Sequence, residues 1–210
     1  MSRTRSSASV PTPPTRRGRR TASSRVTDAA AASAGAASPD EGPVAAGPSR
    51  VHVPIHLRWG DLDALGHVNN TAMLKLLEEA RLRAFWYSDG DEEPLPTAVF
   101  DMDVLASGGE RATLIARQEI EYFRPTPYTQ RPLDVRMWIG AMGGSSADIC
   151  FEVYSPVGDP ERVLYARATA VVVLVDTSTG RPIRWTDAER AAWAPYTGDP
   201  IEYRRRAARA

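Results

Sequence analysis

Hydrophobic residues follow two different periods along the chain, which predict strands in some segments and a helix in another. From residue 51 to 57 every second residue is apolar (VHVPIHL), which predicts a half-buried strand. Pro54 within it favours a position at a sheet edge. From residue 70 to 87 the apolar residues recur at helical spacing, which predicts one long helix. Its apolar positions, which cover more than one face, are Met73, Leu74, Leu76, Leu77, Ala80, Leu82, Ala84 and Phe85.

After this helix the alternating pattern returns and predicts four or five strands. Their expected ranges are 97–105, 112–123, 133–141, 147–154 and 163–175, with Gly- and Pro-rich turns between them. In the range 112–123 one face is expected to present Leu114, Ala116, Ile120 and Tyr122. A short helix is predicted over residues 186–193, because Thr186 and Glu189 have the spacing of a capping box.

The order of these elements indicates the fold class. One strand, one long helix and then a run of antiparallel strands are typical of an α+β domain. Asn69 or Asn70 is expected to cap the long helix. Because this helix is too apolar for a surface position, we expect a curved antiparallel sheet to wrap around it.

The first fifty residues differ in composition from the rest of the chain. They contain no Leu, Ile, Phe, Tyr or Trp and are rich in Ala, Ser, Pro, Thr and Arg. Such a segment cannot bury enough apolar surface to offset the entropy lost on ordering, so residues 1–50 are predicted to be a disordered tail. Residues 51–195 are predicted to form the globular domain, and residues 196–210 a basic C-terminal tail.

Charge and cysteine content argue against several classes of function. Acidic and basic side chains number 26 each, but residues 1–50 contain eight Arg and three acidic residues, which leaves the remainder with a net charge of −5. A mildly acidic domain argues against nucleic-acid binding.

No stretch approaches the roughly eighteen apolar residues of a membrane span. The single cysteine, Cys150, excludes an internal disulfide and a multi-thiolate metal site. We therefore expect a cytoplasmic protein without a metal site, and Cys150 as a small core residue.

The stretch with the clearest chemistry is residues 58–70, RWGDLDALGHVNN. It places two carboxylates, Asp61 and Asp63, in a short turn between the first strand and the start of the long helix. Unpaired N–H groups and the positive end of the helix dipole lie at such a helix start. The segment is not a calcium loop, because counting from Asp61 places Leu65 and Ala72 where an EF-hand needs oxygen ligands.

The GDLDALGHVNN run followed by a helix resembles the hotdog-fold acyl-CoA thioesterases of the 4-hydroxybenzoyl-CoA thioesterase-like family. Weaker similarities follow at residues 122–125 (YFRP), 144–146 (GSS) and 176–182 (DTSTGRP), so the resemblance covers about residues 51–195. It implies a hotdog fold, with a curved antiparallel sheet around one central helix. It also implies hydrolysis of an acyl- or aroyl-CoA thioester to the free acid and CoA. CoA is then part of the substrate, and no separate cofactor is expected.

The resemblance also assigns roles to residues of the loop. It implies that Asp63 is the catalytic carboxylate, acting as nucleophile or general base, and that an amide near Asn70 polarises the thioester carbonyl. The wider set of substrate or oxyanion residues is Gly66, His67, Val68, Asn69 and Asn70. Gly66 lets the backbone approach the substrate closely. Asp61 is expected to be a turn residue.

Two alternatives accompany this assignment. A second hotdog lineage has its catalytic Glu on the central helix, so Glu78 and Glu79 are the alternative catalytic residues; otherwise they are expected to pair with Lys75 and Arg83. The alternative function is a non-catalytic hotdog protein that binds an acyl thioester or acts as an assembly partner.

The substrate and the assembly are specified only in part. The resemblance implies a homodimer or homotetramer with sites shared between subunits, and neither nucleic acid nor a membrane is an expected partner. The sequence does not fix the length or aromaticity of the acyl group. The basic residues considered for CoA are Arg111, Arg117 and Arg124.

Overall fold

The structure, a computed structural model, describes residues 49–87, 94–101 and 108–204. All of these lie in one compact unit, Pro43–Ala210. The predicted N-terminal tail falls outside the described residues except for its last two. In chain order the elements are β1 (Val51–Ile55), η1 (Trp59–Asp61), α1 (Asn70–Phe85), β2 (Trp86–Tyr87), β3 (Phe100–Asp101), β4 (Arg111–Tyr122), β5 (Leu133–Met142), β6 (Ser146–Tyr154), β7 (Leu164–Asp176), α3 (Asp187–Trp193) and η2 (Ala194–Tyr196).

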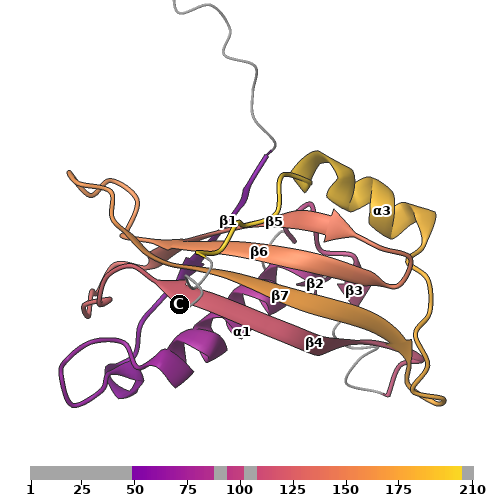
Figure 1. Cartoon of the computed structure of the whole chain (residues 1–210), viewed down its shortest axis with the longest axis horizontal. Coiled ribbons are helices and arrows are strands. Elements are labelled where there is room, and N and C mark those ends of the chain that lie inside the picture. Colours follow the sequence, from indigo (N-terminus) through magenta and orange to yellow (C-terminus); the bar gives the residue numbers. More distant parts are fainter. Residues whose placement is uncertain (1–48, 88–93, 102–107, 205–210) are drawn as a thin grey trace, which may run out of the picture. The chain divides into compact units, whose positions relative to one another are not determined.

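Five strands form one antiparallel sheet in the order β1-β5-β6-β7-β4 (Figure 1). Strand β1 lies at one edge, as Pro54 predicts, and β4 lies at the other. The sequence-adjacent strands β5, β6 and β7 pair with their neighbours through short connections. By contrast, β4 pairs with β7 along nearly its whole length, from Arg111 opposite Asp176 to Tyr122 opposite Ala166, although β5 and β6 lie between them in the sequence.

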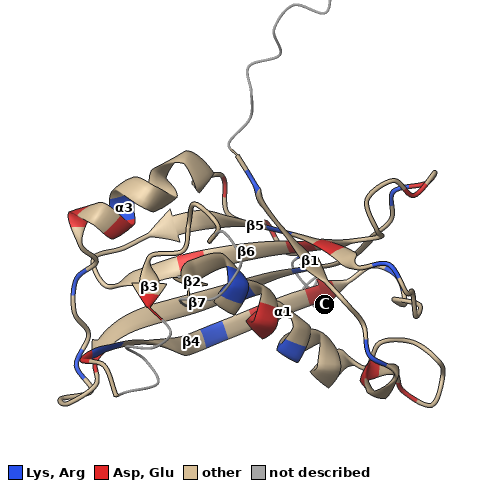
Figure 2. Cartoon of the chain, turned by 180° about the vertical axis from the view of Figure 1, so that it is seen from behind, with Lys and Arg blue, Asp and Glu red and all other residues tan. Residues whose placement is uncertain are grey.

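Helix α1 lies along one face of this sheet (Figure 2). Asn69 caps the helix, because its side chain accepts a hydrogen bond from the Thr71 amide. The buried positions of the helix are Met73, Leu77, Ala80, Arg81, Ala84 and Phe85. All of them except Arg81 pack in one core with alternate residues of the central strands, among them Val135, Met137, Ile139, Ala166, Ala168 and Ala170. The α+β arrangement of a helix against an antiparallel sheet is thus as predicted.

The prediction for Leu74 was wrong. Leu74 is 36% exposed, whereas Met73 is 2% exposed. The buried stripe runs through positions 73, 77, 80 and 84. Each residue of an α-helix is rotated by about 100° from the one before it, so the side chain of residue 74 points about 100° away from that of residue 73 and lies outside the stripe. Leu76 and Leu82 are partly buried against the core, which agrees with the expected second covered face.

The predicted face of β4 was also wrong. The register between β4 and β7 shifts between Ile115 and Arg117, so Ala116 is the extra residue of a β-bulge. A bulge of one residue reverses the face on which the following side chains lie. Ile120 and Tyr122 therefore face the same side as Ile115, and Leu114 faces the opposite side. Alternation counted along one strand cannot reveal this shift.

Strand 97–105 is only partly observed. Within the described residues it contains β3, two residues long, which pairs in parallel with β2; residues 102–107 are outside the described part. Thr97, the first residue of the predicted strand, is not part of a strand. It is buried, and its hydroxyl donates to the Ala84 carbonyl at 2.6 Å. The helix over 186–193 is confirmed, with the reciprocal Thr186–Glu189 capping box.

The described residues that follow α3 lie against the face of the sheet opposite α1. The Gly198 amide donates to the Ile139 carbonyl at 2.9 Å, and Trp138 Nε1 donates to the Asp199 carbonyl at 2.9 Å. Tyr203 donates through its hydroxyl to Thr169 Oγ1 at 2.8 Å. The first part of the predicted C-terminal tail is therefore packed on the sheet. Cys150 is fully buried there, as expected.

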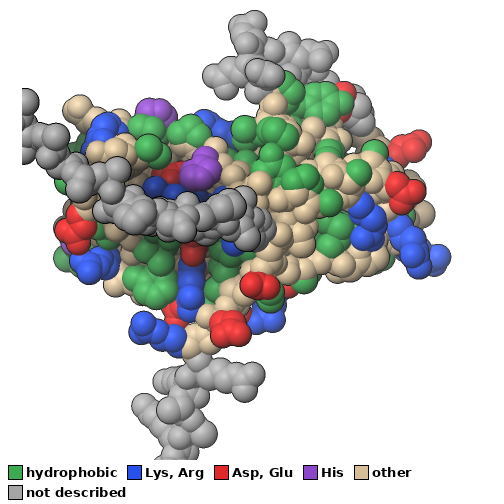
Figure 3. Space-filling model, turned by 90° about the horizontal axis from the view of Figure 1, so that it is seen from above, with side chains coloured by type: hydrophobic (Ala, Val, Ile, Leu, Met, Phe, Trp, Pro, Cys, Tyr) green, Lys and Arg blue, Asp and Glu red, His purple; other side chains and the backbone are tan. Residues whose placement is uncertain are grey.

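Figure 3 shows acidic and basic side chains scattered among hydrophobic ones on one face of the molecule. No helix in the described ranges is long and apolar enough to cross a membrane.

Candidate active site

The loop between β1 and α1 is a short, closed turn. The Asp63 amide donates to the His67 carbonyl at 2.8 Å, and the Gly66 amide donates to the Asp63 carbonyl at 3.1 Å. Leu62 and Val68 form an antiparallel bridge on either side of this turn. Gly66 closes it with a φ of 77°, a left-handed conformation that other residues adopt only with strain.

The turn is fixed to the chain segment after β4. The Val68 amide donates to the Thr126 carbonyl at 2.9 Å, and His67 forms a bridge with Pro127. Thr126 is buried. These contacts join two segments that are far apart in the sequence, and they hold the carboxylate turn against the end of β4.

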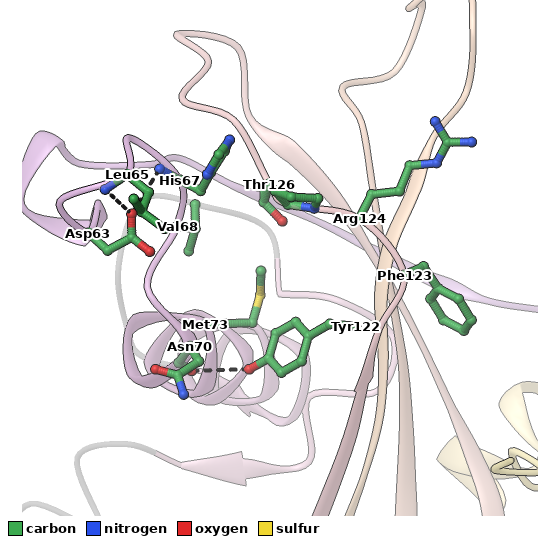
Figure 4. A pocket seen from close by; sticks show the side chains of 11 residues that line it. Asp63, Leu65, His67, Val68, Asn70, Met73, Tyr122, Phe123, Arg124 and Thr126 are labelled. Atoms are coloured by element: carbon green, nitrogen blue, oxygen red, sulfur yellow. Dashed lines mark hydrogen bonds between the residues drawn. The ribbon is translucent and has the colours of Figure 1, made fainter.

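Asp63 has one carboxylate oxygen engaged by the loop. Its Oδ1 accepts hydrogen bonds from the amides of Leu65, at 2.8 Å, and His67, at 3.2 Å (Figure 4). Its Oδ2 makes no hydrogen bond with any described residue. The side chain is therefore oriented by two backbone donors, and its second oxygen remains available to a ligand.

Asp61 has the role expected of a turn residue. Its Oδ2 accepts a hydrogen bond from the Arg58 amide at 2.6 Å, and its carbonyl accepts one from the Asn69 amide at 2.8 Å. Asp61 thereby connects the end of β1 to the start of α1, and it is not among the residues that line the adjacent cavity.

The helix start offers free backbone donors, as expected. The Thr71 amide is taken by the Asn69 side chain at 2.8 Å, and the Met73 amide by the Asn69 carbonyl at 2.9 Å. In the described structure no hydrogen bond engages the amide of Asn70, the first residue of α1. This unpaired N–H lies at the positive end of the helix dipole.

A cavity of about 400 Å³ lies between the loop, the helix start and the end of β4 (Figure 4). Asp63, His67 and Asn70 line it together with Val68, so four of the six expected loop residues border the same space. Gly66 and Asn69 do not line it. Gly66 shapes the turn, and Asn69 caps the helix.

The opposite wall of the cavity comes from residues that sequence reasoning did not include in the site, apart from Arg124, which was considered for CoA. They are Met73, Tyr122, Phe123, Arg124, Pro125 and Thr126. Tyr122 donates its hydroxyl hydrogen bond to the Asn70 carbonyl at 3.3 Å. Burial raises the pKa of Tyr122, so the phenol stays protonated near neutral pH. The YFRP motif was the available signal for this wall, but it did not indicate that these residues face the loop.

Glu78 and Glu79 are not brought to this cavity. Both side chains are exposed, Glu79 accepts a hydrogen bond from Arg83 Nε at 2.8 Å, and Glu78 lies 3.4 Å from Arg81. The expected pairing of Glu79 with Arg83 is therefore observed, the expected pairing of Lys75 with Glu79 is not found among the described residues, and Glu78 pairs with Arg81. The described residues also contain no group of three or more His, Cys, Asp and Glu side chains that could hold a metal ion.

Comparison with protein families and with individual proteins gives a consistent result. A model of the thioesterase-like superfamily matches residues 57–193, a span that contains the loop, α1 and four strands of the sheet. The chain is 23% identical over 137 residues to the uncharacterized protein YsmA of Bacillus subtilis, a match that covers 65% of this chain and 80% of YsmA.

Two solved structures resemble this one over about three quarters of the chain. One is a predicted thioesterase from Bacillus stearothermophilus, with 24% identity and a TM-score of 0.57, covering 73% of this chain and 100% of that chain. The other is a thioesterase from Thermus thermophilus complexed with coenzyme A and Zn, with 28% identity and a TM-score of 0.52, covering 75% of this chain and 100% of that chain.

Proposed function

We propose, from the premise that this chain belongs to the thioesterase-like superfamily, that its substrate is an acyl- or aroyl-CoA thioester, which it hydrolyses to the free acid and CoA. Membership of this superfamily confirms the hotdog fold and the thioester hydrolase activity expected from the sequence. The identity of the thiol, the acyl group and the catalytic residues belong to the proposal.

The observation that supports the proposal is the pairing of groups around one cavity. Asp63 has an unengaged carboxylate oxygen, and the Asn70 amide is an unpaired donor at a helix start. Thioester hydrolysis needs both, because a base or nucleophile must act at the acyl carbon while a donor stabilises the negative charge that develops on the carbonyl oxygen.

The reaction then follows one of two balanced routes. As general base, Asp63 takes a proton from water, the oxygen attacks the acyl carbon, and the carbon–sulfur bond breaks to release the thiol. As nucleophile, Asp63 forms an anhydride with the acyl group and releases the thiol first, and water then cleaves the anhydride. Single turnover in ¹⁸O-labelled water distinguishes them, because only the anhydride route can leave the label in Asp63.

The CoA part of the substrate is supported by the Thermus thermophilus thioesterase, which was solved with coenzyme A. The lining of the cavity is largely apolar, which suits a pantetheine arm and an acyl chain. Purified protein should release free thiol from at least one member of a panel of short, long and aromatic acyl-CoAs. If no member is hydrolysed, the proposal of acyl-CoA hydrolysis fails, and binding of the same compounds then tests the alternative of a non-catalytic protein.

A homodimer is the second part of the proposal. Strand β4 is a sheet edge with exposed Leu114, Ile115 and Tyr122, and a long edge strand offers a row of unpaired backbone groups to a partner strand. Tyr122 also lines the candidate site, so a second copy paired along β4 would border that cavity. Trp138, on strand β5, is covered by the C-terminal segment and is therefore not exposed for contact with a second copy. Light scattering should give a dimer or a multiple of it at micromolar concentration, and a monomer mass would contradict this part.

A further inference from the structure

Arg124 lies where two cavities meet. It lines the 400 Å³ cavity that contains Asp63, and it also lines a second cavity of about 230 Å³ together with Phe123, Glu161 and Arg162. Figure 4 shows Arg124 and Asp63 on opposite sides of the first cavity, with the Arg124 side chain extended away from its centre. A ligand that reacts at Asp63 and continues past Arg124 therefore reaches the second cavity.

Arg124 differs from its neighbouring arginines in having no side-chain partner among the described residues. Arg131 pairs with Asp159, Arg162 with Asp134 and Arg167 with Glu121. Within the ranges that the structure describes, the guanidinium of Arg124 makes no hydrogen bond, ion pair or ring contact. The backbone at this position is nevertheless held, because the Arg124 amide donates to the Tyr165 carbonyl at 3.3 Å.

The surrounding charge makes this one cation significant. The residues that line the two cavities include two arginines, Arg124 and Arg162, and no lysine. Arg162 already pairs with Asp134. Glu161 and Asp63 add negative charge. Because residues 51–210 together have a net charge of −5, the domain as a whole repels an anionic substrate, and an unpaired guanidinium is needed where an anionic part of that substrate binds.

We propose that Arg124 binds the phosphate groups of the CoA nucleotide and thereby selects CoA thioesters over thioesters of uncharged thiols. This inference rests on the proposed hydrolase function. The guanidinium matches phosphate oxygens with two parallel N–H donors, which an ammonium group cannot do. The acyl thioester lies at Asp63 and the helix start, the pantetheine arm follows the apolar lining, and the phosphates lie at Arg124 and the second cavity.

The test compares three thioesters of one acyl group, carried by CoA, by 3′-dephospho-CoA and by pantetheine, with the parent and with Arg124→Gln and Arg124→Lys. Arg184→Gln is the matched control, because Arg184 is exposed and lines neither cavity. Arg124→Gln should lower the ratio of kcat/KM for acyl-CoA to kcat/KM for acyl-pantetheine about tenfold, the effect of one exposed charge-assisted contact. The loss should fall on KM, because the phosphates do not react, and Arg124→Lys should recover part of it.

Two results would overturn the inference. One is a parent enzyme that uses acyl-pantetheine as well as acyl-CoA, and the other is an Arg124→Gln variant with an unchanged ratio. Calorimetric binding of CoA alone separates this inference from the proposed function. If the parent hydrolyses nothing but binds CoA, with weaker binding in Arg124→Gln and not in Arg184→Gln, the hydrolase proposal fails and the phosphate site stands. Equal binding of CoA by both variants and the parent refutes the site.

Discussion

The change Asp63→Asn tests the chemistry of the site with little disturbance of its shape. The amide oxygen of Asn replaces Oδ1 and can accept the same two hydrogen bonds, from the Leu65 amide at 2.8 Å and the His67 amide at 3.2 Å. The second carboxylate oxygen becomes an NH₂ group, which is neither a base nor a nucleophile. The perturbation is thus confined to the carboxylate oxygen that the loop leaves unengaged.

The expected loss can be estimated from the role of this oxygen. Removal of a positioned proton-transfer group lowers turnover by about 10²- to 10⁴-fold, which corresponds to about 2.7–5.4 kcal/mol of activation free energy. The loop contributes much less to folding. Two hydrogen bonds change from a charged to a neutral acceptor, at a cost of about 1 kcal/mol, so the Tm should fall by only about 2–4 °C.

Thiol release under saturating acyl-CoA gives turnover, calorimetry gives the affinity for substrate, and scanning calorimetry gives the Tm. Asp61→Asn is the matched control, because it makes the same chemical change two residues away, at a carboxylate that only bonds the Arg58 amide. It should reduce turnover much less. The reasoning is refuted if Asp63→Asn has near-normal turnover, and a dead Glu78→Gln or Glu79→Gln enzyme would then place the chemistry on the helix.

Three further outcomes are expected. Removal of residues 1–48 should leave the thermal transition and thiol release unchanged, and collapse of either would show that the domain begins earlier. Gly66→Ala should lower the Tm, because Gly66 has a φ of 77° that places a Cβ in strain; an unchanged Tm would contradict the strain argument. Burial acts to raise the pKa of Asp134, but hydrogen bonds and charges from His52 and Arg162 outweigh it and hold that pKa below its usual range. The resulting stability is present above about pH 3.9, the ordinary pKa of Asp, and is lost as pH falls through the lower folded value. The Tm gap between the parent and Asp134→Asn should therefore be wide near neutral pH and close below about pH 4.

The local elements of the fold were predictable because their causes lie within a few residues of sequence. Asn69 caps α1 through a hydrogen bond to Thr71, two residues away. Thr186 and Glu189 form their capping box within one helical turn. The carboxylate turn at Asp63 closes on amides two and four residues ahead. Such features depend on the conformational preferences of neighbouring residues, which the sequence displays directly.

The second wall of the site was not predictable in the same way. Tyr122 and Thr126 meet the loop only because β4 pairs with β7 and is thereby brought beside the helix start. The bulge at Ala116 then decides which side chains of β4 face the helix. Arg124 was one of three arginines considered for CoA, and its sequence neighbours do not indicate that it lies between two cavities.

The sequence by itself therefore determined the class of fold and the form of the carboxylate turn, because strand alternation, helix spacing and turn residues are short-range properties. The tertiary structure decided which distant residues complete the cavity, which side chains of β4 lie on the same face as α1, and that the segment after α3 packs on the sheet. These depend on strand register and on contacts across tens of residues, where a shift of one position exchanges the buried and exposed faces.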